Sequence, residues 1–308
     1  SEKYGKYAES RTISLTMNQQ VSSDRMIVQG KQEAEVAISL ASLTSAVDRN
    51  IPLADNKVNG RLALVIGNED YAGGGSLNAQ VNVDYARNDA AIFREYALKT
   101  LGVKEENMFF MTDASAGAMK REIDRVAELL KRLGPDSELI FYYAGHGFPD
   151  EVTRTPYLIP VDVDATNLTY AIRLSDVYRK FSETGAKRIT VFLDACFSGG
   201  ARNQPLLAAR GVRIKPETEP ISGNMMVFAA SSGDQSSLAY QREKHGLFTY
   251  FLLKKLQESG GSITYGELTD YIKREVGIVS VRENGKAQDP EVMVGPAVED
   301  HWREWKVK

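Results

Sequence analysis

The chain has 308 residues, of which 43% are hydrophobic and 26% charged, and its formal net charge is -3 at pH 7. This composition excludes a disordered or fibrous chain, and it lacks the basic excess that suits nucleic acid or an anionic membrane surface. A single cysteine, Cys196, excludes an internal disulfide and a zinc site built from cysteines.

Residues 1–56 differ in composition from the rest of the chain. They are rich in Ser, Gln, Asn and Glu, and their apolar residues between Lys31 and Val47 follow neither a helical nor a strand period cleanly. A cluster of helix-breaking residues that includes Pro52 closes the segment. We therefore expect an N-terminal extension over 1–56, which could cover a cleft as a propeptide would, and one domain over 57–308.

No apolar run approaches the roughly 18 residues that span a bilayer. The first residues also lack the apolar core of a signal peptide. We expect a soluble protein without a membrane or nucleic-acid partner, and the compartment stays open.

From Arg61 onward, short apolar runs alternate with helical stretches. Strands are expected at 62–66, 107–111, 138–144, 188–193 and 225–230, and helices at 84–101, 115–133, 175–182, 246–258 and 264–275. Strands separated by helices predict right-handed crossovers and a mostly parallel sheet with both faces covered. The expected fold class is an α/β three-layer sandwich, whose site should lie at the carboxyl ends of the strands.

Two of these strand ends carry residues suited to catalysis. One strand runs into Gly145-His146-Gly147, and a later one runs into Asp194-Ala195-Cys196. If the strands are neighbours, an imidazole and a thiol lie side by side. A thiol with an ordinary pKa of about 8.5 is mostly protonated at neutral pH, so a nearby histidine is needed to take its proton. The backbone N–H groups of Gly147 and Cys196 could then form an oxyanion hole, which completes the parts for acyl transfer.

The two motifs resemble those of the caspase and metacaspase family of cysteine peptidases. Tyr-Ala-Gly-His-Gly ends at Gly147, Asp-Ala-Cys-Phe-Ser-Gly begins at Asp194, and 50 residues separate His146 from Cys196. Metacaspases are the nearer match, because Asp-Ala-Cys-Phe-Ser-Gly replaces the caspase Gln-Ala-Cys-Arg-Gly. The resemblance implies a caspase-like sandwich and a cysteine endopeptidase with a His146–Cys196 dyad.

The resemblance also implies a specificity for basic side chains at P1, the substrate position before the cleaved bond. Metacaspases cleave after Arg or Lys, with acidic residues at the positions of Asp89 and Asp194, because paired carboxylates bind a guanidinium and reject an acidic group. Alternatively, Asp89 is a charge at a helix N-terminus and Asp194 a turn cap. The loop that walls the substrate cleft in the family corresponds to Ser232, Asp234 and Ser236.

The segment after Cys196 has two interpretations. It is long, polar and rich in basic residues, which is typical of a mobile surface loop. It could instead be an activation loop that the enzyme itself cleaves after Arg210 or Arg213.

Some metacaspases are activated by calcium, which needs several oxygen ligands. The matching acidic residues would be Asp162, Asp164 and Asp176, but Asn203 stands where another acidic ligand is expected. We therefore predict no metal and no cofactor, with calcium activation as the weaker alternative.

The leading hypothesis is a cysteine endopeptidase that acts on polypeptides, most simply as a monomer. Two alternatives stay open. One is a non-catalytic caspase-like scaffold, against which the intact dyad argues, and the other is a peptide ligase that uses the same acyl-enzyme chemistry.

Overall fold

The computed structural model describes residues 45–73, 82–163, 167–198, 215–217, 219–233 and 235–308, together with two short strands nearer the N-terminus. The chain divides into two compact units, Ser1–Ala46 and Val47–Lys308. In the first unit, β1 (Arg25–Met26) pairs with β2 (Ile38–Ser39) in antiparallel fashion.

The second unit is built on a mostly parallel sheet, which has eight strands in the described part of the chain. The main path is β12 (Glu291–Val294), β9 (Met225–Ala229), β8 (Arg188–Cys196), β5 (Glu138–Pro149), β3 (Arg61–Gly67) and β4 (Met108–Thr112). Only β12 runs antiparallel along this path, where it pairs with β9. The other two strands of the sheet lie off this path: β6 (Pro156–Leu158) pairs with the end of β5, and β7 (Ile172–Arg173) pairs with β6. A separate antiparallel pair is formed by β10 (Ala239–Tyr240) and β11 (His245–Gly246).

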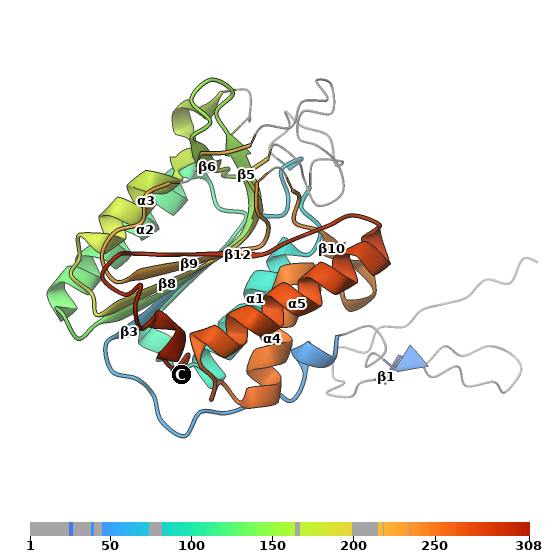
Figure 1. The fold of residues 1–308 in the computed structure, drawn as a ribbon, viewed down its shortest axis with the longest axis horizontal. Helices are drawn as coiled ribbons and strands as arrows, with labels where there is room; N and C mark the ends of the chain where they lie inside the picture. The colour runs from blue at the N-terminus through green and yellow to red at the C-terminus, as the bar shows by residue number, and fades with distance from the viewer. Residues whose placement is uncertain are drawn as a thin grey trace, which may run out of the picture. The chain divides into compact units, whose positions relative to one another are not determined.

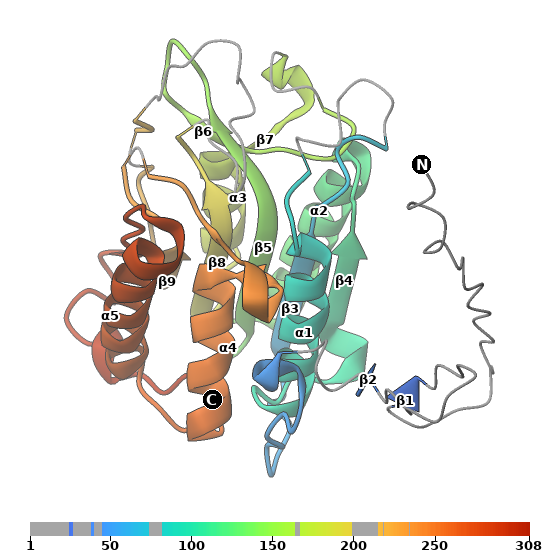
Figure 2. The same cartoon turned by 90° about the vertical axis from the view of Figure 1, so that its right-hand side faces the viewer.

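Helices cover both faces of this sheet (Figures 1 and 2). One face packs against α2 (Ala116–Leu133) and α3 (Leu174–Ser182), and the other against α1 (Ala86–Lys99), α4 (Leu247–Ser259) and α5 (Tyr265–Asn284). Short 3-10 helices lie at Ala46–Asp48, Glu105–Asn107, Leu168–Tyr170, Gln241–Glu243 and Trp302–Glu304. None of the described helices is long and apolar enough to cross a membrane.

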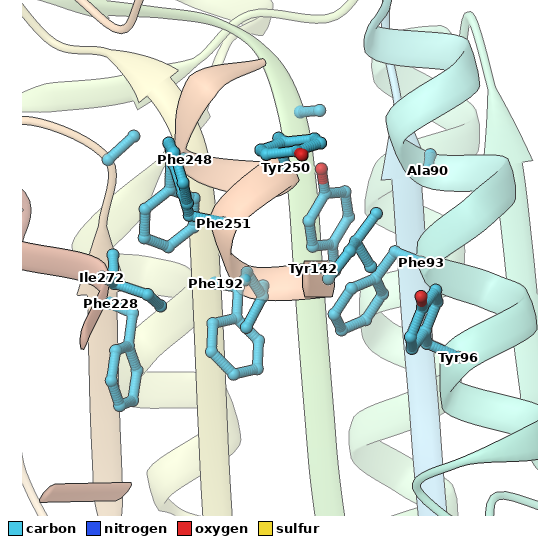
Figure 3. Packing of buried hydrophobic residues seen from close by; sticks show 14 of the residues in the cluster. Ala90, Phe93, Tyr96, Tyr142, Phe192, Phe228, Phe248, Tyr250, Phe251 and Ile272 are labelled. Atoms are coloured by element: carbon cyan, nitrogen blue, oxygen red, sulfur yellow. The ribbon is translucent and has the colours of Figure 1, made fainter. Parts of the chain in front are cut away.

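Side chains along the central strands alternate between these two layers, as the pleat of a strand requires. Tyr142 and Phe192 point toward α1 and α4, whereas Tyr143 and Leu193 point toward α2 and α3. Figure 3 shows aromatic rings from neighbouring strands packed beside Phe93 of α1, whose ring stacks on Tyr142 at 4.3 Å between centroids. The expected α/β sandwich is therefore confirmed, with an apolar core on each side of the sheet.

Four elements differ clearly from the sequence-based expectation. The strand expected over 188–193 continues to Cys196, because β8 stays paired with β5 beyond its apolar run. The strand expected over 138–144 continues to Pro149, because β5 pairs with β8 as far as His146 and then with β6. Helix α5 continues nine residues beyond its expected end, since Val276 and Val279 remain on its buried face. The sequence pattern does not predict the edge strand β12.

The first turn of α1 is held directly against the carboxyl end of β3. A Cβ added at Gly67, the last residue of β3, would lie 2.4 Å from the carbonyl oxygen of Ala86 and 2.6 Å from Cβ of Ala90. Only glycine allows this approach. The close packing brings Asp89, which lies in that first turn, to the same edge of the sheet as the ends of β5 and β8.

Candidate active site

His146 and Cys196 lie directly opposite each other on adjacent parallel strands. The pairing of β5 with β8 continues in register from Glu138 opposite Arg188 to His146 opposite Cys196. Side chains at opposed positions of paired strands project to the same face of the sheet. The structure therefore brings together the two residues that the motifs single out, and buries both, with exposed fractions of 1% for His146 and 3% for Cys196.

Two tyrosines fix the backbone at His146. The Tyr71 hydroxyl accepts a hydrogen bond from the His146 N–H (2.9 Å) and donates one to the carbonyl oxygen of Ile159 (2.9 Å). The Tyr143 hydroxyl donates to the His146 carbonyl oxygen (2.8 Å), and the Tyr71 ring lies 4.4 Å from the imidazole. Burial raises the pKa of both tyrosines, so both hydroxyls stay protonated and keep these bonds at neutral pH.

The backbone is also closely packed beside the nucleophile candidate. A Cβ at Gly147 would lie 2.7 Å from the Phe197 ring and 2.9 Å from the carbonyl oxygen of Cys196. The Gly147 backbone can therefore approach Cys196 only because it carries no side chain. The role of the Gly147 and Cys196 N–H groups in an oxyanion hole stays a prediction.

Ser237 contacts Cys196 through its backbone. Its N–H donates a hydrogen bond to Cys196 Sγ (2.6 Å), and its carbonyl oxygen lies 3.5 Å from the same sulfur, where it accepts from the thiol. The Ser237 hydroxyl donates to Oδ1 of Asp194, and Ser237 is fully buried. Ser237 ends the loop of residues 231–237, which the family resemblance assigns to the wall of the substrate cleft, but its contact with Cys196 is not predicted from the sequence.

Asp194 is buried on the side of the sheet that faces α4. Its Oδ2 accepts hydrogen bonds from the backbone N–H (3.2 Å) and the hydroxyl (2.6 Å) of Thr249, the third residue of α4. The Thr249 hydroxyl in turn lies 2.7 Å from the Tyr142 hydroxyl. The carboxylate is thus held by groups from two different segments of the chain.

Asp89 binds a buried histidine, His245. Its Oδ1 lies 2.7 Å from Nδ1 of His245, and both of its oxygens accept from the Gly246 N–H (3.1 and 3.0 Å). Nε2 of His245 lies 2.8 Å from Oδ1 of Asp48. Burial lowers the pKa of His245, but hydrogen bonds and charge from Asp48 and Asp89 outweigh it and raise that pKa to about 9.

His245 is therefore an imidazolium at neutral pH, with each ring nitrogen donating to a carboxylate. The three side chains join the first turn of α1, strand β11 just before α4, and the segment around Asp48. Nothing in the spacing of these residues marks the cluster, because 156 residues separate Asp89 from His245.

The remaining predicted residues are dispersed. Ser232 lines a cavity of about 280 Å³ on the α3 side of the sheet, and Ser236 is half-buried. Asp234, Arg210, Arg213, Asp164 and Asn203 lie outside the described residues. Asp162 accepts a hydrogen bond from the Ala116 N–H (2.7 Å), and Asp176 forms an ion pair with Arg179 (3.0 Å). Across the part of the chain that the structure describes, no three His, Cys, Asp or Glu side chains form a group that could hold a metal ion.

A thiol and an imidazole thus lie on paired strands at the carboxyl end of a parallel sheet, a combination that suits nucleophilic acyl transfer. The sequence model of the caspase domain of peptidase family C14 matches residues 60–297. The chain therefore belongs to the caspase-domain family of cysteine peptidases.

Curated relatives include two fungal metacaspases. The chain is 27% identical to Metacaspase-1 of Schizosaccharomyces pombe over 174 residues, and 25% identical to Metacaspase-1 of Eremothecium gossypii over 195 residues. These matches cover 51% and 58% of this chain but only 41% and 40% of the relatives. The chain thus spans less than half the length of these relatives.

Solved structures support the fold assignment. Caspase-1 from Spodoptera frugiperda aligns with a TM-score of 0.54 at 17% identity, over 80% of this chain and 91% of the caspase. A Geobacter sulfurreducens protein aligns with a TM-score of 0.53 at 17% identity, over 76% of this chain and 93% of that protein.

Proposed function

We propose that this protein is a cysteine endopeptidase in which Cys196 is the nucleophile and His146 the general acid–base. The observation that carries the proposal is the in-register placement of His146 opposite Cys196 at the carboxyl edge of the sheet, in a chain of the caspase-domain family. The alternatives of a scaffold and a ligase have no structural feature of their own in support.

The reaction would proceed in two halves. His146 takes the thiol proton, and the Cys196 sulfur attacks the carbonyl carbon of the substrate, so that the carbonyl electron pair moves to oxygen. The backbone N–H groups of Gly147 and Cys196 donate to that oxyanion. The tetrahedral intermediate collapses, the C–N bond breaks, and the imidazolium protonates the departing amine. Water, deprotonated by His146, then hydrolyses the thioester and restores the thiol.

Tyr71 and Tyr143 would act as positioning residues for His146. They hold its N–H and its carbonyl oxygen and leave the imidazole to exchange protons. Preorganised hydrogen bonds of this kind keep a catalytic base oriented without rearrangement during the reaction.

We also propose that the enzyme cleaves after Arg or Lys, with Asp194 supplying negative charge at P1, whereas the charge of Asp89 is already paired with the His245 imidazolium. In support, Asp194 lies on β8 two residues before Cys196, and strand alternation directs both side chains to one face. The same specificity would allow the enzyme to cut its own chain after Arg210 or Arg213.

Peptide hydrolysis by wild-type protein and by Cys196→Ala tests this function. Fluorogenic peptides with Arg, Lys or Asp at P1 should give activity for the first two with wild-type protein and none with the variant. Activity that survives in Cys196→Ala would refute the mechanism, and preferential cleavage after Asp would refute the specificity. Mass spectrometry of the products separates hydrolysis from ligation, and a folded wild-type protein without turnover, with or without calcium, indicates a scaffold.

A further inference from the structure

We infer that Ser237 shields Cys196 and occupies Asp194 at the same time, and that a basic P1 side chain displaces it from both. The shielding follows from the contacts of this one residue with the nucleophile and with the carboxylate. The release by a basic side chain rests in addition on the proposed function. We call residues 235–238 the cover segment.

The contact with Cys196 is incompatible with a bound substrate. Nucleophilic attack needs the substrate carbonyl carbon at about 3–3.5 Å from the sulfur. In this structure the Ser237 backbone nitrogen lies 2.6 Å from Sγ and its carbonyl oxygen 3.5 Å from it. With Cys196 only 3% exposed, the cover segment must move before a peptide can reach the thiol.

The contact with Asp194 couples this movement to the substrate side chain. The Ser237 hydroxyl is a neutral donor on Oδ1 of Asp194. A guanidinium or ammonium group is a charged donor and binds a carboxylate more strongly. A basic P1 side chain that takes Oδ1 removes the anchor of Ser237, and the backbone of the same residue then loses its fixed place on the sulfur. Acidic or apolar side chains cannot make this exchange.

The cover segment is anchored on both sides of Ser237, so the movement can be local. On one side, the Leu238 N–H donates to Oε1 of Gln288 (2.8 Å), whose Nε2 donates to the Ala230 carbonyl oxygen (2.9 Å). On the other side, the Gln235 carbonyl oxygen accepts from the Ser198 hydroxyl (3.0 Å). Both anchors use main-chain groups of the cover segment and leave the Ser237 hydroxyl as its link to Asp194.

Alkylation by iodoacetamide measures the shielding directly, because Cys196 is the only cysteine. Ser237→Ala should be alkylated at least about tenfold faster than wild type, since a buried hydrogen bond to a carboxylate is lost from the closed state. Ser137→Ala is the matched control. Ser137 is equally buried, and its hydroxyl donates to the Gly134 carbonyl oxygen (2.6 Å) in the turn before β5. Its alkylation rate should equal that of wild type.

A second pair of reagents tests the coupling to P1. N-acetylarginine amide should accelerate alkylation of the wild-type protein, whereas N-acetylcitrulline amide, its isosteric but uncharged counterpart, should not. In Ser237→Ala the arginine compound should give no further acceleration. Equal acceleration by the two compounds would overturn the coupling.

Equal alkylation rates in wild type and Ser237→Ala would overturn the shielding. Should circular dichroism show that Ser237→Ala is not folded, Gln288→Met replaces it, because it removes the Leu238 anchor at similar volume, and the same increase is expected. The peptidase proposal is judged separately. If Ser237→Ala is alkylated faster but the wild-type protein does not hydrolyse Arg peptides, the shielding stands and the peptidase proposal is refuted. If the wild-type protein hydrolyses Arg peptides but Ser237→Ala is alkylated at the wild-type rate, the peptidase proposal stands and the shielding is refuted.

Discussion

The Asp48–His245–Asp89 cluster should make the stability of the fold depend on pH above neutrality. His245 is fully buried, and its pKa rises from 6.5 to about 9 in the folded protein. The folded state therefore binds the proton more tightly than the unfolded state. The stabilisation is fully present below about pH 6.5 and is lost as the pH rises through about 9. The shift corresponds to at most about 3 kcal/mol of unfolding free energy.

Urea unfolding followed by fluorescence of the two tryptophans measures this effect. Because other groups also titrate, the informative quantity is the difference in unfolding free energy between wild type and His245→Gln. That difference should shrink by about 3 kcal/mol between about pH 6 and about pH 10. Ser137→Ala, which removes a buried hydroxyl but no titratable group, provides the control and should differ from wild type by a constant amount. A difference for His245→Gln that does not change over this range would refute the charge assignment.

Two further substitutions test the packing and the positioning around the site. Gly67→Ala forces a Cβ against Ala86 and Ala90, and should lower the unfolding free energy by about 1–3 kcal/mol in the same urea assay; an unchanged midpoint would contradict the close approach of α1. Tyr71→Phe keeps the ring beside His146 but loses its hydroxyl contacts, and should lower kcat for an Arg peptide by about tenfold. KM should stay unchanged, and a loss confined to KM would contradict a positioning role.

Much of the fold follows from local pattern. Buried strands such as β3 are continuous apolar runs, and helices such as α2 show an apolar stripe that ends at Gly134. The strand β12 cannot be predicted from local pattern, because it has only four residues and its side chains are exposed or half-buried. Its position depends on its pairing with β9. The full length of α5 cannot be predicted either, because Gly277 suggests a helix end, although the helix continues through this residue.

The residues of the candidate site also differ in whether the sequence alone identifies their role. His146 and Cys196 can be found from sequence because each follows an apolar strand within a motif. The contacts of Ser237 and His245 cannot be predicted in this way, since their partners lie 41 to 197 residues away and arrive through tertiary packing alone. Tyr71 stands at the start of a Gly-rich stretch that the sequence indicates only as a turn.

Because β8 and β9 are neighbours in the sheet, the fold does not depend on an unbroken chain between them. β8 and β9 are joined along the chain through residues 197–224, yet they pair directly, with Ile189 opposite Met225. Across this pairing Phe192 lies 5.1 Å from Phe228 between ring centroids. A cut after Arg210 or Arg213 would therefore leave two polypeptides that share one sheet and the apolar cores on both of its faces. Such a protein would show two bands on a denaturing gel and a single particle in gel filtration, so proteolytic nicking and loss of activity need not coincide.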